Sequence, residues 1–322
     1  MARHRRRTKA IGADQSPGAV PGEVITGMHA DREEFGHLQG RSEWVATRDG
    51  RRLHAMVLPG PGPHAPTVVF EAGAATTRSS WALVQPAVGA FARAIVYDRS
   101  GLGRSAPDPD SRTLQRMADD LVDLLDHYGQ GPFILVGHSA GGPITRLAAA
   151  GRADRVAGLV IVDPTDEAAD VLFTPAFRRL ERTAIRVNML LARTRLLAWA
   201  YRFSISALPD DAQRDMRREG FTVGTIHTHA AQARTFLDEL AAWRTSPPGL
   251  GDIPITVISG GRAGDGMPTR LRAQANASHA HRAGQSVNGR HVIAEHSGHY
   301  IPLTEPGVIT DEISRYVLRG HL

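Results

Sequence analysis

Short unbroken apolar runs and longer stretches of helical spacing follow one another along this chain. Each unbroken run predicts a buried strand, because a strand covered on both faces needs no polar positions. These runs lie at residues 67–71, 94–97, 133–136, 156–162 and 255–259, and a further strand is predicted at 291–295. Ahead of them, two extended runs at 42–47 and 52–58 flank Asp49-Gly50 and predict a hairpin.

Helical spacing separates most of the predicted strands. The clearest case begins at Leu114 and ends before Gly129, a residue type that commonly stops a helix. Further helices are predicted at 80–93, 143–150, 269–283 and 306–319. A hairpin followed by alternating strands and helices predicts the α/β class, with a mostly parallel central sheet covered by helices on both faces.

The alternation is interrupted once, between the strands at 156–162 and 255–259. Residues 171–247 contain no predicted strand and favour four helices, at 177–186, 188–203, 210–218 and 225–244. Because ligands in open α/β sheets bind at the carboxyl ends of strands, this inserted segment is expected to cover the site as a helical lid. The predicted organisation is a core of residues 39–170 and 248–322, a lid at 171–247, and a flexible basic tail at 1–38.

Composition narrows the possible chemistry and partners. The 322 residues include no cysteine, which excludes a cysteine nucleophile, a disulfide framework and thiolate metal sites. The net charge of +5 is spread along the chain and only the first seven residues form a basic cluster, so nucleic-acid binding is not predicted. No apolar run approaches the ~18 residues of a membrane span, and the polar stretch at 11–34 argues against a signal peptide. We therefore expect a cytoplasmic protein without a membrane span, and no oligomeric state is predicted.

The most informative stretch of the chain follows the strand at 133–136. Residues 133–142 read F-I-L-V-G-H-S-A-G-G, and a helical pattern comes next. A strand that turns sharply into a helix through G-x-S-x-G is a nucleophile elbow, which holds a serine hydroxyl at the carboxyl edge of a sheet. A Cβ at Gly137 or Gly141 would crowd the neighbouring strand or helix. We therefore predict Ser139 as a nucleophile, at a helix N-terminus that favours developing negative charge.

A serine hydroxyl needs a base to take its proton, and His299 is the best candidate among the 15 histidines. It follows a predicted strand, lies in the loop S-G-H-Y and precedes the last helix, whereas His296 lies closer to the strand and is a weaker candidate. Five others are interpreted as surface or core residues, and i, i+2 spacing does not place two of them on one helix face for a metal: His127, His227, His229, His279 and His281. We expect neither a metal nor an organic cofactor.

With these elements in this order, the sequence resembles the α/β-hydrolase fold family. The resemblance covers roughly residues 43–318 and places the family's nucleophile at Ser139 and its base at His299. It rests on four stretches: A-G-A after a strand (72–74), Y-D-R-S-G-L-G-R-S (97–105), G-H-S-A-G-G (137–142) and S-G-H-Y-I-P-L-T-E-P (297–306).

The resemblance also implies an oxyanion hole made of two main-chain N–H groups. One belongs to Ala140, the residue after the nucleophile, and the other to Ala74, which follows the Gly73 that matches the family's His-Gly loop. Ala72 stands where that loop has its histidine, a departure that leaves the N–H donor untouched. The turn at 98–105 is mainly structural in the family, and we assign it no catalytic role.

Two aspartates compete for the third catalytic position. The family places its acid more often after the strand that follows the lid, where Asp265 lies, and less often after the strand that follows the elbow helix, where Asp163 lies. Asp265 stands in a glycine-rich loop some residues beyond its strand, whereas Asp163 follows its strand directly. Because a rigid strand end positions a carboxylate better than such a loop, we prefer Asp163 and keep Asp265 as the alternative.

These residues predict a serine-dependent hydrolase that cleaves a carboxylic ester, lactone or thioester of a small molecule through an acyl-enzyme. Trp81, His138 and Tyr300 are predicted to line the substrate pocket. One alternative is an acyl transferase, cyclase or other non-hydrolytic enzyme on the same fold, and another is a ligand-binding protein with a decayed site. The full serine, histidine and acid set argues against the decayed site, and Ser139 argues against the aspartate nucleophile of haloalkane dehalogenases and epoxide hydrolases.

Overall fold

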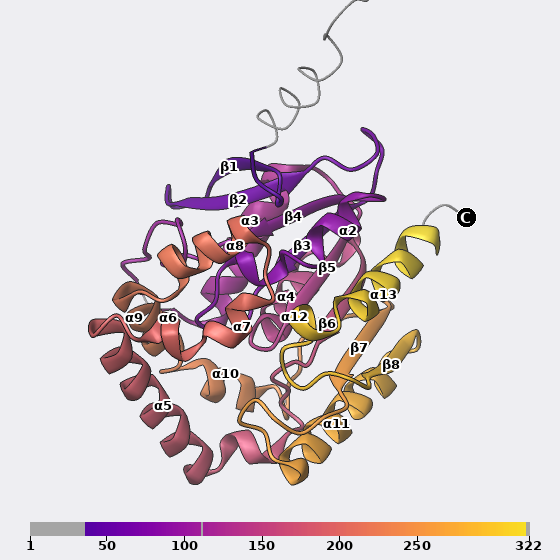
Figure 1. Ribbon diagram of the computed structural model, residues 1–322. Coiled ribbons are helices and arrows are strands. Elements are labelled where there is room, and N and C mark those ends of the chain that lie inside the picture. Colours follow the sequence, from indigo (N-terminus) through magenta and orange to yellow (C-terminus); the bar gives the residue numbers. More distant parts are fainter. Residues whose placement is uncertain (1–35, 111, 320–322) are drawn as a thin grey trace, which may run out of the picture. The chain divides into compact units, whose positions relative to one another are not determined.

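The computed structural model describes residues 36–110 and 112–319, and within these ranges the strands form one eight-stranded sheet (Figure 1). The strand order is β1-β2-β4-β3-β5-β6-β7-β8. The pairs β1–β2 and β2–β4 are antiparallel and every further pair is parallel, so the predicted mostly parallel sheet with its opening hairpin is confirmed. The bounds are β1 Arg41–Ala46, β2 Arg52–Leu58, β3 Thr67–Glu71, β4 Arg93–Tyr97, β5 Phe133–His138, β6 Val156–Val162, β7 Ile255–Gly260 and β8 Gly289–Ala294.

The register of the central strands brings their carboxyl ends to one edge. His138, the last residue of β5, lies opposite Val162, the last residue of β6. On the other side of β5, Gly137 lies opposite Glu71, which ends β3. The segments that follow these three strands therefore begin side by side, and they include Ser139 and Asp163.

Successive residues of a strand point to opposite faces of the sheet, so apolar side chains on both faces need cover. Helices cover each face. In β5, Phe133 and Leu135 pack with α3 and α4, whereas Ile134 and Val136 pack in a second cluster with α2 and α13. α11 contacts β7 and β8 and adds a residue to the first cluster. The bounds are α2 Gln85–Gly89, α3 Leu114–Tyr128, α4 Gly141–Gly151, α11 Thr269–Gly284, α12 Ile301–Thr304 and α13 Pro306–Arg319.

All regular elements between β6 and β7 are helical, as predicted, but these helices begin and end at other residues than predicted. α5 continues through the predicted break at 187 because residues 184–193 include no glycine or proline. The predicted helix at 188–203 is split near Arg195, whose φ of +60° cannot continue a helix. The predicted helix at 225–244 is also split. The bounds are α5 Pro175–Arg193, α6 Leu197–Ala200, α7 Arg202–Ser206, α8 Asp210–Asp215, a π-helical turn Met216–Gly220, α9 Val223–Gln232 and α10 Phe236–Ala242.

The predicted helix at 80–93 is wrong. The structure has a 3₁₀ turn at Arg78–Trp81, the short α2, and then β4, which begins at Arg93. Pro86 lacks an N–H and fits only the first turn of a helix, so it starts α2 and does not extend a preceding one. The amide of the buried Gln85 donates to three main-chain carbonyls, which include that of Ala94 (3.0 Å), and so fixes this segment against the sheet.

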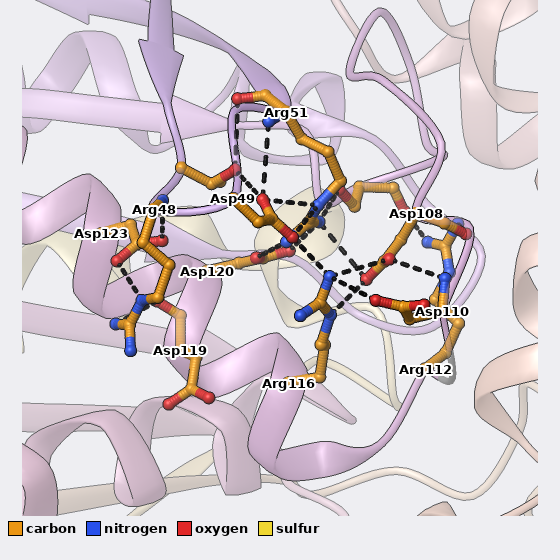
Figure 2. A network of polar contacts seen from close by, with 12 residues as sticks. Arg48, Asp49, Arg51, Asp108, Asp110, Arg112, Arg116, Asp119, Asp120 and Asp123 are labelled. Atoms are coloured by element: carbon orange, nitrogen blue, oxygen red, sulfur yellow. Dashed lines mark hydrogen bonds and ion pairs between the residues drawn. The ribbon is translucent and has the colours of Figure 1, made fainter.

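Ion pairs join the turn of the opening hairpin to α3 (Figure 2). Arg48 Nε donates to Asp123 Oδ1 at 2.8 Å, and Arg51 Nη2 donates to Asp120 Oδ1 at 2.6 Å. Both aspartates are buried, but only Arg51 is also largely buried, so solvent screens the Arg51–Asp120 pair less than the Arg48–Asp123 pair. The cluster holds the antiparallel edge of the sheet against α3.

The predicted tail at 1–38 lies, up to residue 35, outside the described residues. At its end, the Leu38 N–H donates to Asp211 Oδ2 in α8 at 2.6 Å. No helix in the described part of the chain is long and apolar enough to cross a membrane.

Candidate active site

Ser139 lies in the turn between β5 and α4 with a φ of +54°, a conformation that is strained for a residue with a side chain. A Cβ on Gly137 would lie 2.5 Å from the carbonyl oxygen of Gly141, and a Cβ on Gly141 would lie 2.6 Å from that of Glu71. The turn is held by hydrogen bonds from Ser139 N–H to the Val162 carbonyl (3.0 Å) and from Thr165 N–H to the Ser139 carbonyl (3.1 Å). The strained turn therefore fixes the Ser139 hydroxyl at the carboxyl edge of the sheet.

His299 lies between Ser139 and Asp163 and is hydrogen-bonded to both. Its Nδ1 is 2.6 Å from Asp163 Oδ2, and its Nε2 is 3.1 Å from Ser139 Oγ. An ionised carboxylate only accepts hydrogen bonds, so Nδ1 carries the hydrogen, and in the neutral ring the lone pair of Nε2 then faces the serine hydroxyl. The imidazole is therefore in the tautomer that a general base for Ser139 requires.

Asp163 is nearly inaccessible, with 2% of its surface exposed, and its second oxygen is also bound. Oδ1 accepts from the Gly260 N–H (3.0 Å) and from Arg272 Nη1 (2.5 Å). Burial alone would raise the pKa of Asp163. The hydrogen bond with His299, the positive charges that His299 and His279 carry when protonated, and the hydrogen bond from Arg272 together lower the pKa below its usual value. Asp163 is therefore an anion at neutral pH.

Asp265 binds a different part of His299. Its Oδ2 accepts from the main-chain N–H of His299 at 3.1 Å and does not contact the ring. A Cβ on Gly298 would lie 2.4 Å from this oxygen, so the carboxylate packs directly on the loop that carries the histidine. Of the two predicted acids, the structure thus brings Asp163 to the imidazole and Asp265 to the backbone beside it.

Ala74 and Ala140, whose main-chain N–H groups are the predicted oxyanion donors, line one pocket together with Ser139. Within the described ranges, neither N–H donates to an acceptor. Arg99 fixes the loop that carries Ala74, because its guanidinium donates to the carbonyls of Ala72 and Gly73, each at 2.5 Å. In a trans peptide the C=O and N–H point in opposite directions, so the bond to the Gly73 carbonyl also orients the Ala74 N–H. Arg99 comes from the turn at 98–105, to which we assigned no catalytic role, and its place beside the site was not predicted.

The three predicted pocket residues have different positions. His138 Nε2 donates to the carbonyl of His299 at 2.9 Å, and burial lowers the pKa of His138 to about 3, so it is neutral. Tyr300 lies on the pocket wall. The prediction for Trp81 is wrong: its side chain is fully buried in the core against Phe70, where its ring is roughly perpendicular to that of His138.

Two pockets meet at Ser139. The larger pocket, of about 270 Å³, is lined by Ser139, His299 and Tyr300 and by apolar side chains of the inserted helices. The smaller pocket, of about 190 Å³, is lined by Ser139, Ala140 and Arg99 and by residues of α5, α9 and α10. Apolar side chains of the insertion in the larger pocket are Leu197, Tyr201, Ile205, Leu208, Met216, Phe221 and Ile226.

Two further residues were not predicted to contribute to the site. His229, which was interpreted as a surface or core residue, lines both pockets. Burial, and then the positive charge of Arg99, lower the pKa of His229 to about 4. Arg272, the buried partner of Asp163, lies in α11. Its position in the sequence does not set it apart from the other arginines, and only the folded structure shows this contact.

No cluster of three or more metal-ligating side chains is found in the part of the chain that the structure describes.

Comparison with known proteins gives both a family and partial relatives. A family model described as "Alpha/beta hydrolase family" matches residues 68–312. "Putative carbamate hydrolase RutD" from Caulobacter sp. (strain K31) is 36% identical over 118 residues, which are 36% of this chain and 43% of that protein. "Uncharacterized protein YqjL" from Bacillus subtilis (strain 168) is 30% identical over 140 residues, 42% of this chain and 54% of that protein. The chain thus matches only about half of the length of these curated relatives, or less.

Solved structures match over a larger share of the chain. The epoxide hydrolase CorEH has a TM-score of 0.68 at 20% identity, covering 87% of this chain and 99% of that one. A thermophilic esterase from Thermogutta terrifontis has a TM-score of 0.62 at 22% identity, covering 88% of this chain and 100% of that one. At such low identity these similarities concern the fold.

Proposed function

Because this chain belongs to the alpha/beta hydrolase family, we propose that it is a serine hydrolase that cleaves a carboxylic ester, lactone or thioester of a small molecule through an acyl-enzyme. The observation that carries the proposal is the continuous series of hydrogen bonds from Ser139 through His299 to Asp163. The main-chain N–H groups of Ala74 and Ala140, two residues that line a pocket with the serine, add to it because neither donates to an acceptor among the described residues. Nucleophile, base, acid and oxyanion donors are the complete set that acyl transfer through serine requires.

In the proposed mechanism, Ser139 Oγ attacks the substrate carbonyl carbon while His299 Nε2 takes the hydroxyl proton. The N–H groups of Ala74 and Ala140 bind the resulting oxyanion, and each such donor typically contributes ~2.7–4 kcal/mol to transition-state stabilisation. The protonated His299 then gives its proton to the leaving oxygen or sulfur, which departs as an alcohol or thiol.

Water completes the turnover. His299 takes a proton from a water molecule whose oxygen attacks the acyl carbon, and the second tetrahedral oxyanion collapses. The bond to Ser139 Oγ breaks, the proton returns to that oxygen, and the carboxylic acid leaves. Asp163 stays ionised and stabilises the imidazolium formed in each half of the reaction.

We also infer that the inserted helices at 171–247 act as a lid over this site. Side chains from α6 to α9 supply much of the apolar wall of the larger pocket, which supports a role of this segment in substrate selection. The larger pocket is therefore expected to favour apolar substrate groups.

A panel of p-nitrophenyl esters of graded acyl length, a thioester, a lactone and a carbamate tests the proposed function. The carbamate is included because partial relatives bear the name carbamate hydrolase. Wild type is expected to turn over at least one of these compounds, and Ser139→Ala to lose the activity by a factor of roughly 10³ or more. Repeating the reaction with an added alcohol or amine separates hydrolysis from acyl transfer by its products. Equal activity of wild type and Ser139→Ala across the panel would contradict the proposal.

A further inference from the structure

Three buried nitrogen atoms around the smaller pocket have no hydrogen-bond partner among the described residues. They are Arg99 Nε, His229 Nδ1 and Gln232 Nε2, and all three side chains line that pocket. Arg99 is 4% exposed and Gln232 is 5% exposed. Buried polar groups without partners are rare because they are destabilising, so three of them around one cavity indicate that something else satisfies them.

The type of atom that would satisfy them follows from these groups. The Nε of an arginine is only a donor, and a glutamine amide nitrogen is also a donor. The neutral His229 ring can donate through Nδ1 in one of its tautomers. The complementary ligand atom is therefore an acceptor oxygen, in a pocket whose other walls are largely apolar, such as Met117 and Phe236.

The charges around the smaller pocket do not favour an anion. The positive charge of Arg99 is already paired with the buried carboxylate of Glu71. The half-buried Glu181 adds a second carboxyl group to the pocket wall. A ligand carboxylate would meet the carboxyl group of Glu181 and an arginine whose charge is already paired, whereas an uncharged oxygen can accept from the donors without adding a charge.

The position of the base indicates which part of the substrate enters the smaller pocket. His299 must give its proton to the leaving group, and of the two pockets it lines the larger one. Of the two oxyanion donors, Ala140 lines only the smaller one and Ala74 lines both. With the carbonyl oxygen at the donors and the leaving group towards His299, the acyl chain extends into the smaller pocket.

We propose, building on the proposed serine hydrolase function, that the smaller pocket binds an acyl group bearing an uncharged acceptor oxygen, such as a keto oxygen, and the larger pocket binds an apolar leaving group. The substrate class is therefore an ester of a short oxo acid with an apolar alcohol. Arg99, His229 and Gln232 select this acid by donating to the oxygen on its chain.

The test compares p-nitrophenyl 4-oxopentanoate and 5-oxohexanoate with the plain p-nitrophenyl pentanoate and hexanoate. The kcat/KM of each ester is divided by the rate constant for hydroxide-catalysed hydrolysis of the same ester. This division removes the intrinsic effect of the keto group. In wild type, kcat/KM for the preferred oxo ester is expected to exceed that of its alkyl analogue roughly tenfold or more, because the alkyl chain leaves the donors unpaired. The monoester p-nitrophenyl succinate, which carries a carboxylate, is expected to be slower than the pentanoate.

The variant Gln232→Leu is expected to lower the oxo-to-alkyl ratio severalfold, whereas Gln115→Leu, at an exposed position of α3, keeps the wild-type ratio. Gln232→Leu is also expected to raise the melting temperature of the free protein, because it removes an unpaired buried donor. An oxo-to-alkyl ratio of kcat/KM near one for both oxo esters in wild type overturns the proposal, whatever the variants show. A preference for the succinate overturns the claim that the oxygen is uncharged. Absence of Ser139-dependent hydrolysis of every ester would instead contradict the proposed function itself.

Discussion

Asp163 and Asp265 both bind His299, but one contacts its ring and the other its backbone. Asp163 Oδ2 accepts from the ring at 2.6 Å, while Asp265 Oδ2 accepts from the main-chain N–H at 3.1 Å. A group on the ring fixes the tautomer and stabilises the imidazolium, whereas a group on the backbone only helps to place the loop. The two carboxylates are therefore expected to differ greatly in their effect on turnover.

Asp163→Asn is expected to lower kcat by a factor on the order of 10⁴, because the amide cannot hold the imidazole in the required tautomer. Asp265→Asn is expected to change kcat only severalfold, since its amide oxygen still accepts the His299 N–H. Steady-state kinetics on the best ester of the panel measures both variants. A large loss for Asp265→Asn together with a mild one for Asp163→Asn would reassign the acid.

At the scale of elements, the turn from β5 into α4 depends on close backbone approach at Gly141. There a Cβ would lie 2.6 Å from the carbonyl oxygen of Glu71 in β3, and backbone cannot move aside as a flexible side chain can. Gly151 ends the same helix, and a Cβ there would meet nothing within 4 Å. Replacing glycine by alanine at each end of α4 therefore distinguishes the effect of steric crowding on stability from the effect of helix propensity.

Gly141→Ala is expected to lower the free energy of unfolding by roughly 1–3 kcal/mol through overpacking, and to lower kcat because the turn that holds Ser139 shifts. Gly151→Ala is expected to be neutral or to stabilise by up to about 1 kcal/mol, as alanine favours helix. Urea denaturation and ester kinetics measure both effects. Equal stability of the two variants would show that the turn tolerates a side chain.

At the scale of the whole molecule, buried histidines from different elements make stability depend on pH. Burial lowers the pKa of His138 to about 3, and burial followed by the charge of Arg99 lowers that of His229 to about 4. Burial also lowers the pKa of His279, whose ring is held between Ser259 and the Pro164 carbonyl. In the unfolded chain a histidine titrates near pH ~6.5.

Between the unfolded pKa and these lowered folded values, the unfolded state binds more protons than the folded state. The free energy of unfolding is therefore expected to fall as the pH falls from about 6.5 to about 4. His229→Gln is expected to flatten this slope by roughly one proton. Urea titrations across this pH range measure the slope, and an unaltered slope in His229→Gln would contradict the assignment of a lowered pKa to that ring.

The sequence predicted most of the fold and part of the site, and the reason differs between residues. Ser139 and its elbow were predictable because the strand, the glycines and the helix are adjacent in the chain. The preference for Asp163 rested on its place directly at a strand end, whereas the contact of Asp265 with the main chain of His299 depends on packing between distant segments. Arg99 and His229 become part of the site only through long-range packing, which leaves no local pattern.

The most direct test of the central claim, acyl transfer through Ser139, is mass spectrometry of the intact protein after reaction with a fluorophosphonate, followed by peptide mapping. One adduct per chain is predicted, on Ser139, with none on Ser139→Ala and much slower labelling of His299→Gln, in which the base is absent. Labelling of wild type and Ser139→Ala at the same rate, or no labelling of wild type at all, would contradict it.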